Sequence, residues 1–211
     1  MVKRGAFIVF EGIDGSGKST HMRLLIDDLN RRSYDVLQTA EPTRGAIGAF
    51  IREYMGSATT RLPPEVEALL FAADRFEHVK GIIEPAIERG QIVVSDRYLH
   101  STLAYQGAAG LSLEWIREIN RFALVPDLCI LLDVSPEIGL SRLGRRRKTV
   151  FEELAIQHEV RNLYLDFVRR GEMVKVDAEG SVEEVQRQVS SLVMNLLQGI
   201  GKTMNRATSA I

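Results

Sequence analysis

The sequence has little of what stabilises disulfide-linked, metal-bound or membrane-embedded proteins. Its 211 residues include one cysteine and four histidines, so the chain cannot form an internal disulfide, and the histidines are too scattered to build a metal cluster with Cys129. That thiol lies in an apolar run, which favours a buried structural residue in a reducing compartment. The apolar run Ala6–Phe10 ends at Glu11, well short of a signal sequence or a membrane span. We therefore expect a cytoplasmic protein with no membrane partner.

An excess of charge of one sign is also lacking. The chain has 27 Lys and Arg against 28 Asp and Glu, for a formal net charge of −1. A near-neutral chain gains little from bulk attraction to phosphate backbones, so we expect no nucleic-acid partner, although this argument leaves room for a small basic site. At about 150 residues per domain we expect a single domain over residues 1–198. Residues 199–211 lose helical periodicity and are expected to form a flexible tail.

Short apolar runs alternate with longer amphipathic segments along the chain. The expected strands are Ala6–Phe10, Val36–Thr39, Ile92–Ser95, Leu128–Leu132 and Met173–Val176. The expected helices are Lys18–Arg32, Pro64–Lys80, Leu113–Phe122, Pro136–Leu143, Phe151–Arg170 and Val182–Leu197. The first, third and fourth strands are continuously apolar, which is typical of strands covered on both faces. The pattern predicts an α/β fold, a doubly wound five-stranded parallel sheet flanked by helices, with ligands at the carboxyl ends of the strands.

The most specific motif follows the first expected strand. Its nine residues match G-x-x-x-x-G-K-[ST] and are Gly12, Ile13, Asp14, Gly15, Ser16, Gly17, Lys18, Ser19 and Thr20. Its glycines let backbone N–H groups converge on phosphate oxygens, and the following helix adds its positive end. We expect Lys18 to reach the β- and γ-phosphates of ATP and the Ser19 hydroxyl to bind Mg²⁺. A glycine-rich turn without a ligand is the weaker alternative, because the motif lies between a strand and a helix as the chemistry requires.

A phosphate loop alone does not separate a kinase from a GTPase switch or a motor ATPase. Guanine-specific proteins usually carry N-K-x-D after a strand, and the nearest candidate, 174–177, lacks the Asn. Asp96 and Arg97 follow the third expected strand. There, a carboxylate can orient Mg²⁺ with Ser19, and a guanidinium can clamp a phosphate. Taken alone, these two residues are equally well explained as a surface ion pair.

Four segments, two of which contain the residues just described, carry a family resemblance. The segments Phe7–Thr20, Glu41–Arg44, Leu70–Arg75 and Asp96–Gln106 resemble, in order, those of thymidylate kinase. The resemblance implies a transferase that moves the γ-phosphoryl group of ATP to the 5′-phosphate of dTMP, giving dTDP and ADP for dTTP synthesis. It also implies Mg²⁺ as cofactor and a homodimer. The hydrophobic segment Leu99–Ala109, with Leu111, is a candidate to contribute to the dimer interface.

The expected acceptor site combines an aromatic ring with arginines. Phe71 and Arg75 are four residues apart, hence on one helix face. In isolation such a pair is more simply a core Phe beside a solvated Arg. The resemblance implies that Phe71 stacks on thymine and Arg75 contacts its O4. It further implies that Ser101 lies near the base and Tyr105 lies under the sugar, disfavouring a 2′-OH, with core packing as the alternative for Tyr105.

Charged residues complete the expected dTMP site. Arg44 and Arg97 resemble the family's clamp on the monophosphate, and Asp14 resembles the carboxylate on the 3′-OH side. Glu11 precedes the phosphate loop and can be explained as a structural hydrogen-bond acceptor.

A basic run lies between two expected helices and comprises Arg142, Arg145, Arg146, Arg147 and Lys148. It could be a solvated face or a nucleic-acid patch, but the net charge and the absence of interleaved aromatic residues disfavour the latter. We expect a lid at about 142–151 that closes over ATP, because arginines stabilise the charge of phosphoryl transfer. The family has two forms, with Arg in the phosphate loop or with Gly there and arginines in the lid, and Gly15 resembles the second. We expect Arg145 and Arg146 to act in catalysis with Lys18 and Arg97, and Arg142 to pack near the adenine.

The expected reaction needs no general base. The second pKa of a phosphate monoester is about 6, so the attacking oxygen is already ionised at neutral pH. A kinase for an acceptor hydroxyl would need a base, and the arginine-rich acceptor site disfavours it. A nucleotide-dependent switch, which would bind ATP without consuming a monophosphate, is the alternative from another class.

Overall fold

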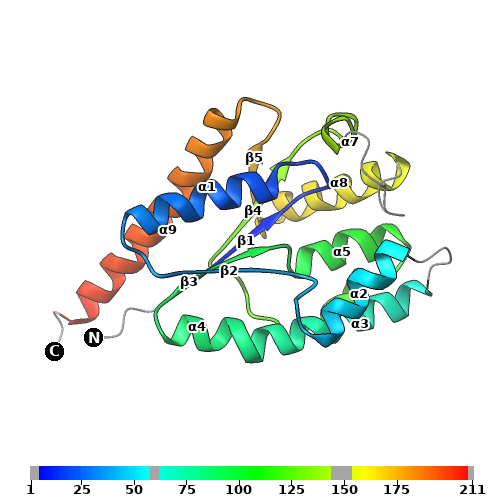
Figure 1. Ribbon diagram of the computed structural model, residues 1–211, viewed down its shortest axis with the longest axis horizontal. Helices are drawn as coiled ribbons and strands as arrows, with labels where there is room; N and C mark the ends of the chain where they lie inside the picture. Colours follow the sequence, from blue (N-terminus) through cyan, green and yellow to red (C-terminus); the bar gives the residue numbers. More distant parts are fainter. Residues whose placement is uncertain (1–4, 58–61, 144–153, 209–211) are drawn as a thin grey trace.

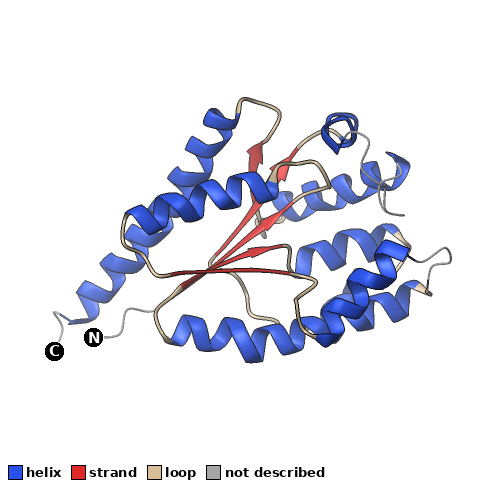
Figure 2. Ribbon diagram, viewed as in Figure 1, coloured by secondary structure: helices blue, strands red, loops and turns tan. Residues whose placement is uncertain are grey.

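One parallel sheet organises the protein (Figures 1 and 2). The computed structural model describes residues 5–57, 62–143 and 154–208. The strands β1 (Ala6–Glu11), β2 (Val36–Ala40), β3 (Ile92–Asp96), β4 (Leu128–Asp133) and β5 (Val174–Asp177) pair in the order β2-β3-β1-β4-β5. All five strands expected from the sequence are present, and the predicted fold class is confirmed.

Helices cover both faces of this sheet (Figure 1). They are α1 (Lys18–Arg31), α2 (Ala46–Ser57), α3 (Pro64–His78), the π-helical turn η1 (Val79–Ile83), α4 (Glu84–Glu88), α5 (Leu99–Ala108), α6 (Leu113–Ile119), α7 (Pro136–Leu143), α8 (Leu154–Arg169) and α9 (Val182–Thr208). Along β1, Ile8 and Phe10 pack under α1 and α9, whereas Phe7 and Val9 pack under η1, α5, α6 and α8. Because successive side chains point to opposite faces, the continuously apolar β1 serves two cores.

The α-helix expected over Pro64–Lys80 ends at His78. The chain stays helical beyond that residue, through the π-helical turn and into α4. The N–H of Glu84 bonds to the carbonyl of Val79, five residues back. Pro85 follows directly, has no N–H to donate, and its ring would crowd the carbonyl four residues before it. A wider turn accommodates the proline without ending the helical rod.

Helices α2 and α9 also differ from the sequence-based expectations. Helix α2 was not expected at all. Its Gly48 is required by packing, since a Cβ there would overlap Thr43 and come within 2.7 Å of Asp74 Oδ1. Helix α9 extends through Thr208, although we expected a flexible tail from residue 199. The glycines at 199 and 201 weaken a helix by about 1 kcal/mol each, which does not by itself end one.

The carboxyl ends of the strands meet at one edge of the sheet, where the phosphate loop follows β1 and Arg97 follows β3. No helix within the described residues has the length and apolar content to cross a membrane. Helix α5, expected to contribute to a subunit interface, is largely buried within the chain, and its residues Thr102, Leu103, Ala104, Tyr105 and Gln106 are each 7% exposed or less.

Candidate active site

The phosphate loop joins β1 to α1 through three glycines in left-handed or related conformations. The φ angles of Gly12, Gly15 and Gly17 are 143°, 79° and 92°. A Cβ on Gly15 would overlap the carbonyl of Gly139, because the loop packs directly against the start of α7. An arginine at position 15 has no room in this arrangement, which agrees with the resemblance to the family form that carries glycine there.

Lys18 lies in the centre of this loop. Its Nζ donates to the carbonyls of Gly12 at 2.8 Å and Ile13 at 3.0 Å. Burial, assisted by the nearby charge of Arg97, lowers the pKa of Lys18 to about 8. The ammonium is therefore charged at neutral pH but close to the pH at which it loses its proton.

Ser19 and Asp96 come together beside the loop as the sequence predicts. The Ser19 hydroxyl donates to Asp96 Oδ2 at 3.4 Å, and Asp96 Oδ1 is buried without a hydrogen-bond partner among the described residues. A hydroxyl and a carboxylate with an unused oxygen fit a hard divalent cation such as Mg²⁺. The described part of the chain has no cluster of three or more acidic, histidine or cysteine ligands, so phosphates and waters would have to complete the coordination.

Arg97 links the phosphate loop to α5. It adopts a left-handed backbone conformation with φ 69°, and its guanidinium forms an ion pair with Asp14. The same group donates to Ser101 Oγ at 3.1 Å and lies 5.3 Å from the centre of the Tyr105 ring. Burial alone would raise the pKa of Asp14, but the charges of Arg97 and Lys18 outweigh it and hold that pKa below its ordinary value.

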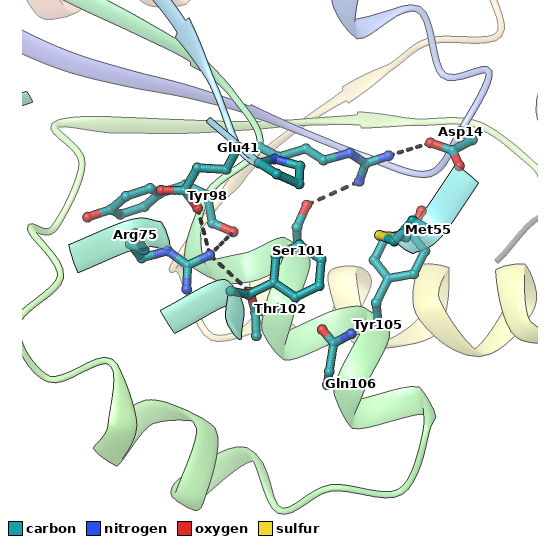
Figure 3. A pocket seen from close by; sticks show the side chains of 12 residues that line it. Asp14, Glu41, Met55, Arg75, Tyr98, Ser101, Thr102, Tyr105 and Gln106 are labelled. Atoms are coloured by element: carbon teal, nitrogen blue, oxygen red, sulfur yellow. Dashed lines mark hydrogen bonds and ion pairs between the residues drawn. The ribbon is translucent and has the colours of Figure 1, made fainter. Parts of the chain in front are cut away.

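A cavity of about 210 Å³ opens beside this ion pair (Figure 3). Of the seven residues predicted for dTMP, six line it: Asp14, Phe71, Arg75, Arg97, Ser101 and Tyr105. Arg44 is solvent-exposed on the loop after β2 and is not among the described lining residues. The structure therefore brings one face of α3 and one face of α5 together with the phosphate loop and leaves Arg44 outside the cavity.

Arg75 is not the solvated arginine of the simpler interpretation, since its side chain is only 1% exposed. Its Nη1 donates to Asn120 Oδ1 at 2.6 Å, and its Nη2 donates to Thr102 Oγ1 at 2.9 Å. Nη2 also lies 2.7 Å from Glu41 Oε2 in an ion pair. Figure 3 shows Arg75 joined to Glu41 and Thr102 at one end of the cavity.

Glu11 has the structural role that the sequence suggests. Its buried carboxylate accepts hydrogen bonds from the backbone N–H groups of Tyr98 and Ser101, at 2.9 and 3.1 Å, and so caps the start of α5. It also accepts from the hydroxyls of Ser101 and Tyr164, at 2.6 and 2.9 Å. These bonds fix α5 and its cavity-facing residues relative to β1.

Tyr105 lies one turn after Ser101 on the same face of α5. Burial raises the pKa of Tyr105 to about 12, so its hydroxyl remains protonated at neutral pH. The ring lies beneath Arg97 and lines the cavity, which places a flat apolar surface next to the arginine.

Only the beginning of the expected lid lies within the described residues. Arg142 Nη2 donates to the carbonyl of Ala178 at 3.0 Å, which ties the end of α7 to the loop after β5. Arg145 and Arg146 lie outside the described residues.

Six further lining residues were not identified as site residues from the sequence: Glu41, Pro42, Met55, Tyr98, Thr102 and Gln106. Met55 belongs to the unpredicted α2, so its place could not be foreseen. Thr102 and Gln106 follow Ser101 and Tyr105 by one residue on α5. The five residues other than Met55 stand in the segments Glu41–Arg44 and Asp96–Gln106 that carried the family resemblance, which was the signal that could have found them.

The model of the thymidylate kinase family matches residues 10–189. The chain is 47% identical over 197 residues to a probable thymidylate kinase of Thermococcus onnurineus, covering 89% of this chain and 96% of that protein. It is 47% identical over 204 residues to a probable thymidylate kinase of Pyrococcus abyssi, covering 93% and 100%. It is 43% identical over 189 residues to the thymidylate kinase of Akkermansia muciniphila, covering 89% and 90%. With its phosphate loop, its Arg97–Asp14 pair and its aromatic cavity, the chain belongs to the thymidylate kinase family.

Proposed function

We propose that the protein transfers the γ-phosphoryl group of ATP to the 5′-phosphate of dTMP, giving dTDP and ADP. The observation that carries this proposal is the cavity beside the phosphate loop, which combines an arginine suited to a phosphate, Arg97, with a ring and an arginine suited to a pyrimidine, Phe71 and Arg75. Membership of the thymidylate kinase family supports the same reaction.

The chemistry is charge neutralisation and alignment. The attacking oxygen of a monophosphate is already ionised near pH 7, since its second pKa is about 6. The obstacle is repulsion between two polyanions, which the charges of Lys18 and Arg97 reduce. Ser19 and Asp96 would hold a Mg²⁺ ion, which supplies further neutralisation when bound. Asp14 holds the Arg97 guanidinium at the junction of the two sites.

On the acceptor side, different residues bind the base, the sugar and the phosphate. Phe71 stacks on the base, and Arg75 donates to its 4-carbonyl. Ser101 and Tyr105 face the nucleoside from α5, with the Tyr105 ring under the sugar. Arg44 is exposed on the loop after β2, and its long side chain turns onto the 5′-phosphate once that phosphate is bound.

On the donor side, Gly12 to Thr20 surround the phosphates and Arg142 lies against the adenine. Arg145 and Arg146 act from a lid over the transferred group, where exclusion of water limits hydrolysis of ATP. The buried free thiol of Cys129 favours a reducing, cytoplasmic location.

We also propose a homodimer formed through α3. Val66, Leu69 and Phe76 form a stripe at helical spacing on α3 and are 39%, 50% and 49% exposed. Large apolar side chains grouped in this way mark an interaction surface. Light scattering should give twice the monomer mass for the wild type and the monomer mass for Leu69→Lys; a monomeric wild type would exclude this interface.

A coupled assay of ADP release across a panel of nucleoside monophosphates tests the proposed function. We expect strong ADP release with ATP and dTMP, and little with dCMP, dAMP or dGMP. ADP release that does not depend on any monophosphate would favour a switch or ATPase, and release that requires a nucleoside or another small acceptor would favour a kinase of different specificity.

A further inference from the structure

A buried chain of polar groups lies behind Arg75 and takes no part in the steps described above. Arg75 Nη2 lies 2.7 Å from Glu41 Oε2. The other oxygen of that carboxylate, Oε1, lies 3.0 Å from His78 Nδ1, and His78 Nε2 lies 2.6 Å from Thr39 Oγ1. The chain of contacts therefore runs from the cavity to Thr39 on β2 through three side chains.

These groups are almost completely removed from water. The side chains of Arg75, Glu41 and His78 are 1%, 3% and 0% exposed. A buried carboxylate needs partners for both oxygens, because an uncompensated charge is costly in the interior. Arg75 supplies an ion-pair partner to Oε2, and His78 supplies a hydrogen-bond partner to Oε1. Arg75 and Glu41 line the cavity, whereas His78 is not among the described lining residues, so it can affect a ligand only through Glu41.

The local structure makes His78 suited to this task. His78 is the last residue of α3, one turn after Arg75, so both face the same side of the helix. They bracket Glu41, which follows β2 at the edge of the sheet where the site lies. The carboxylate is thus fixed from both ends. Together with the acceptors on Asn120, Thr102 and the Tyr98 carbonyl, it limits where the Arg75 guanidinium can lie, and it is the only charged partner among them.

We propose that His78 is a positioning residue for base selection. By holding Glu41, it keeps Arg75 in one orientation, in which the guanidinium favours a pyrimidine with a 4-carbonyl over one with a 4-amino group. An arginine has hydrogen-bond donors only. It can therefore donate to a 4-carbonyl oxygen, whereas a 4-amino group would place a second donor against it. The discrimination depends on the guanidinium being unable to move aside. This inference rests on the proposed function, because it assumes that dTMP occupies the cavity.

Three substitutions of His78 separate the two contacts. His78→Asn retains a side-chain donor near the position of Nδ1 and so keeps the link to Glu41. His78→Gln places its amide near the position of Nε2 and keeps only the link to Thr39. His78→Leu removes both. The three side chains are similar in size, so their differences report on hydrogen bonding more than on packing.

The measurement compares kcat and KM for dTMP and for 5-methyl-dCMP, which differ only at the 4-position and the adjoining ring nitrogen. We expect the preference of the wild type for dTMP to fall about 10- to 100-fold in His78→Leu and His78→Gln, the range of a hydrogen bond to a charged group. The loss should arise mainly from a higher KM for dTMP. His78→Asn should restore the preference to within about threefold of the wild type, on the same scale.

A purely structural histidine would behave differently. It would lower kcat for both substrates alike in all three variants, in step with their melting temperatures, and leave the ratio unchanged. That result, or a full preference for dTMP in His78→Gln, would overturn the inference. If the wild type does not phosphorylate dTMP at all, the proposed function fails instead. Should His78→Leu not fold, the pair His78→Gln and His78→Asn decides the question.

Discussion

The buried Lys18 predicts that ATP affinity depends on pH in a range where most lysines are fully charged. Burial lowers the pKa of Lys18 to about 8 in the free protein, whereas bound phosphates favour its charged form. With a pKa of about 8, the charged fraction falls from about 0.9 at pH 7 to about 0.1 at pH 9. If only the charged form binds, the Kd for ATP rises about tenfold over this range, which corresponds to ~1.4 kcal/mol.

Isothermal titration calorimetry with Mg-ATP, in buffers of differing ionisation enthalpy and without dTMP, measures both consequences. Besides the weaker binding at pH 9, about half a proton should be taken up per ATP bound at pH 8. Lys18→Met should bind weakly and lose this pH dependence. Lys80→Gln, which removes an exposed lysine paired with Glu84, is the matched control and should keep it. An affinity that is constant from pH 7 to 9, or release of protons on binding, would refute the reasoning.

The lowered pKa of Lys18 also makes the free energy of unfolding depend on pH. The pKa of the folded state lies below the unfolded value of 10.5, so the folded state binds fewer protons between the two values. The cost of burying the charge is therefore fully present below pH 8 and disappears as the pH rises toward 10.5. Denaturant titrations should show that Lys18→Met raises the free energy of unfolding relative to the wild type, and that this increase is largest below pH 8.

Further predictions concern single residues of the site. Arg97→Ala should lower kcat about 10³-fold, within the range for arginines in phosphoryl transfer, while changing the melting temperature by only a few degrees, because the Arg97–Asp14 pair is partly exposed; an enzyme with near-normal turnover would contradict the assigned role. Asp14, whose pKa is lowered, contributes stability that is present above its unfolded pKa and lost as the pH falls below it, so acid titrations of the wild type and Asp14→Asn should differ only at the acidic end. Gly15→Ala should destabilise the protein by about 1–3 kcal/mol and weaken ATP binding, because its φ of 79° is strained for alanine and the Cβ overlaps Gly139; unchanged chemical denaturation would argue against that packing. Glu11→Gln should cost about 2–4 kcal/mol by placing an amide donor against the donors that the carboxylate accepts, as measured by the free energy of unfolding.

The sheet and the phosphate loop were predictable because their signals are local. A strand buried on both faces must be continuously apolar, as Ile8 to Phe10 are, and a loop that binds phosphate through backbone N–H groups must carry glycine at fixed places. Helix α2 gave no such signal, since Gly48 opposes helix formation and is explained only by the approach of Thr43 and Asp74. The continuation of α9 past Gly199 likewise depends on the context of a helix that is already formed.

The cavity shows the same division between local and long-range information. The i, i+4 spacing on α3 and α5 correctly placed Phe71 and Arg75, and Ser101 and Tyr105, on shared faces. It could not show that Arg75 would be buried against Glu41 and Asn120, because those partners come from distant segments. The position of Arg44 outside the cavity likewise depends on the path of a loop that no sequence period describes.

The most direct test of the proposed reaction follows the phosphoryl group itself. Protein incubated with γ-³²P-ATP, Mg²⁺ and dTMP should place the label in the β-phosphate of dTDP, with one dTDP formed for each ADP. Label that remains in ATP, or that appears as inorganic phosphate whether or not dTMP is present, would contradict the assignment of the cavity beside Arg97 as the acceptor site.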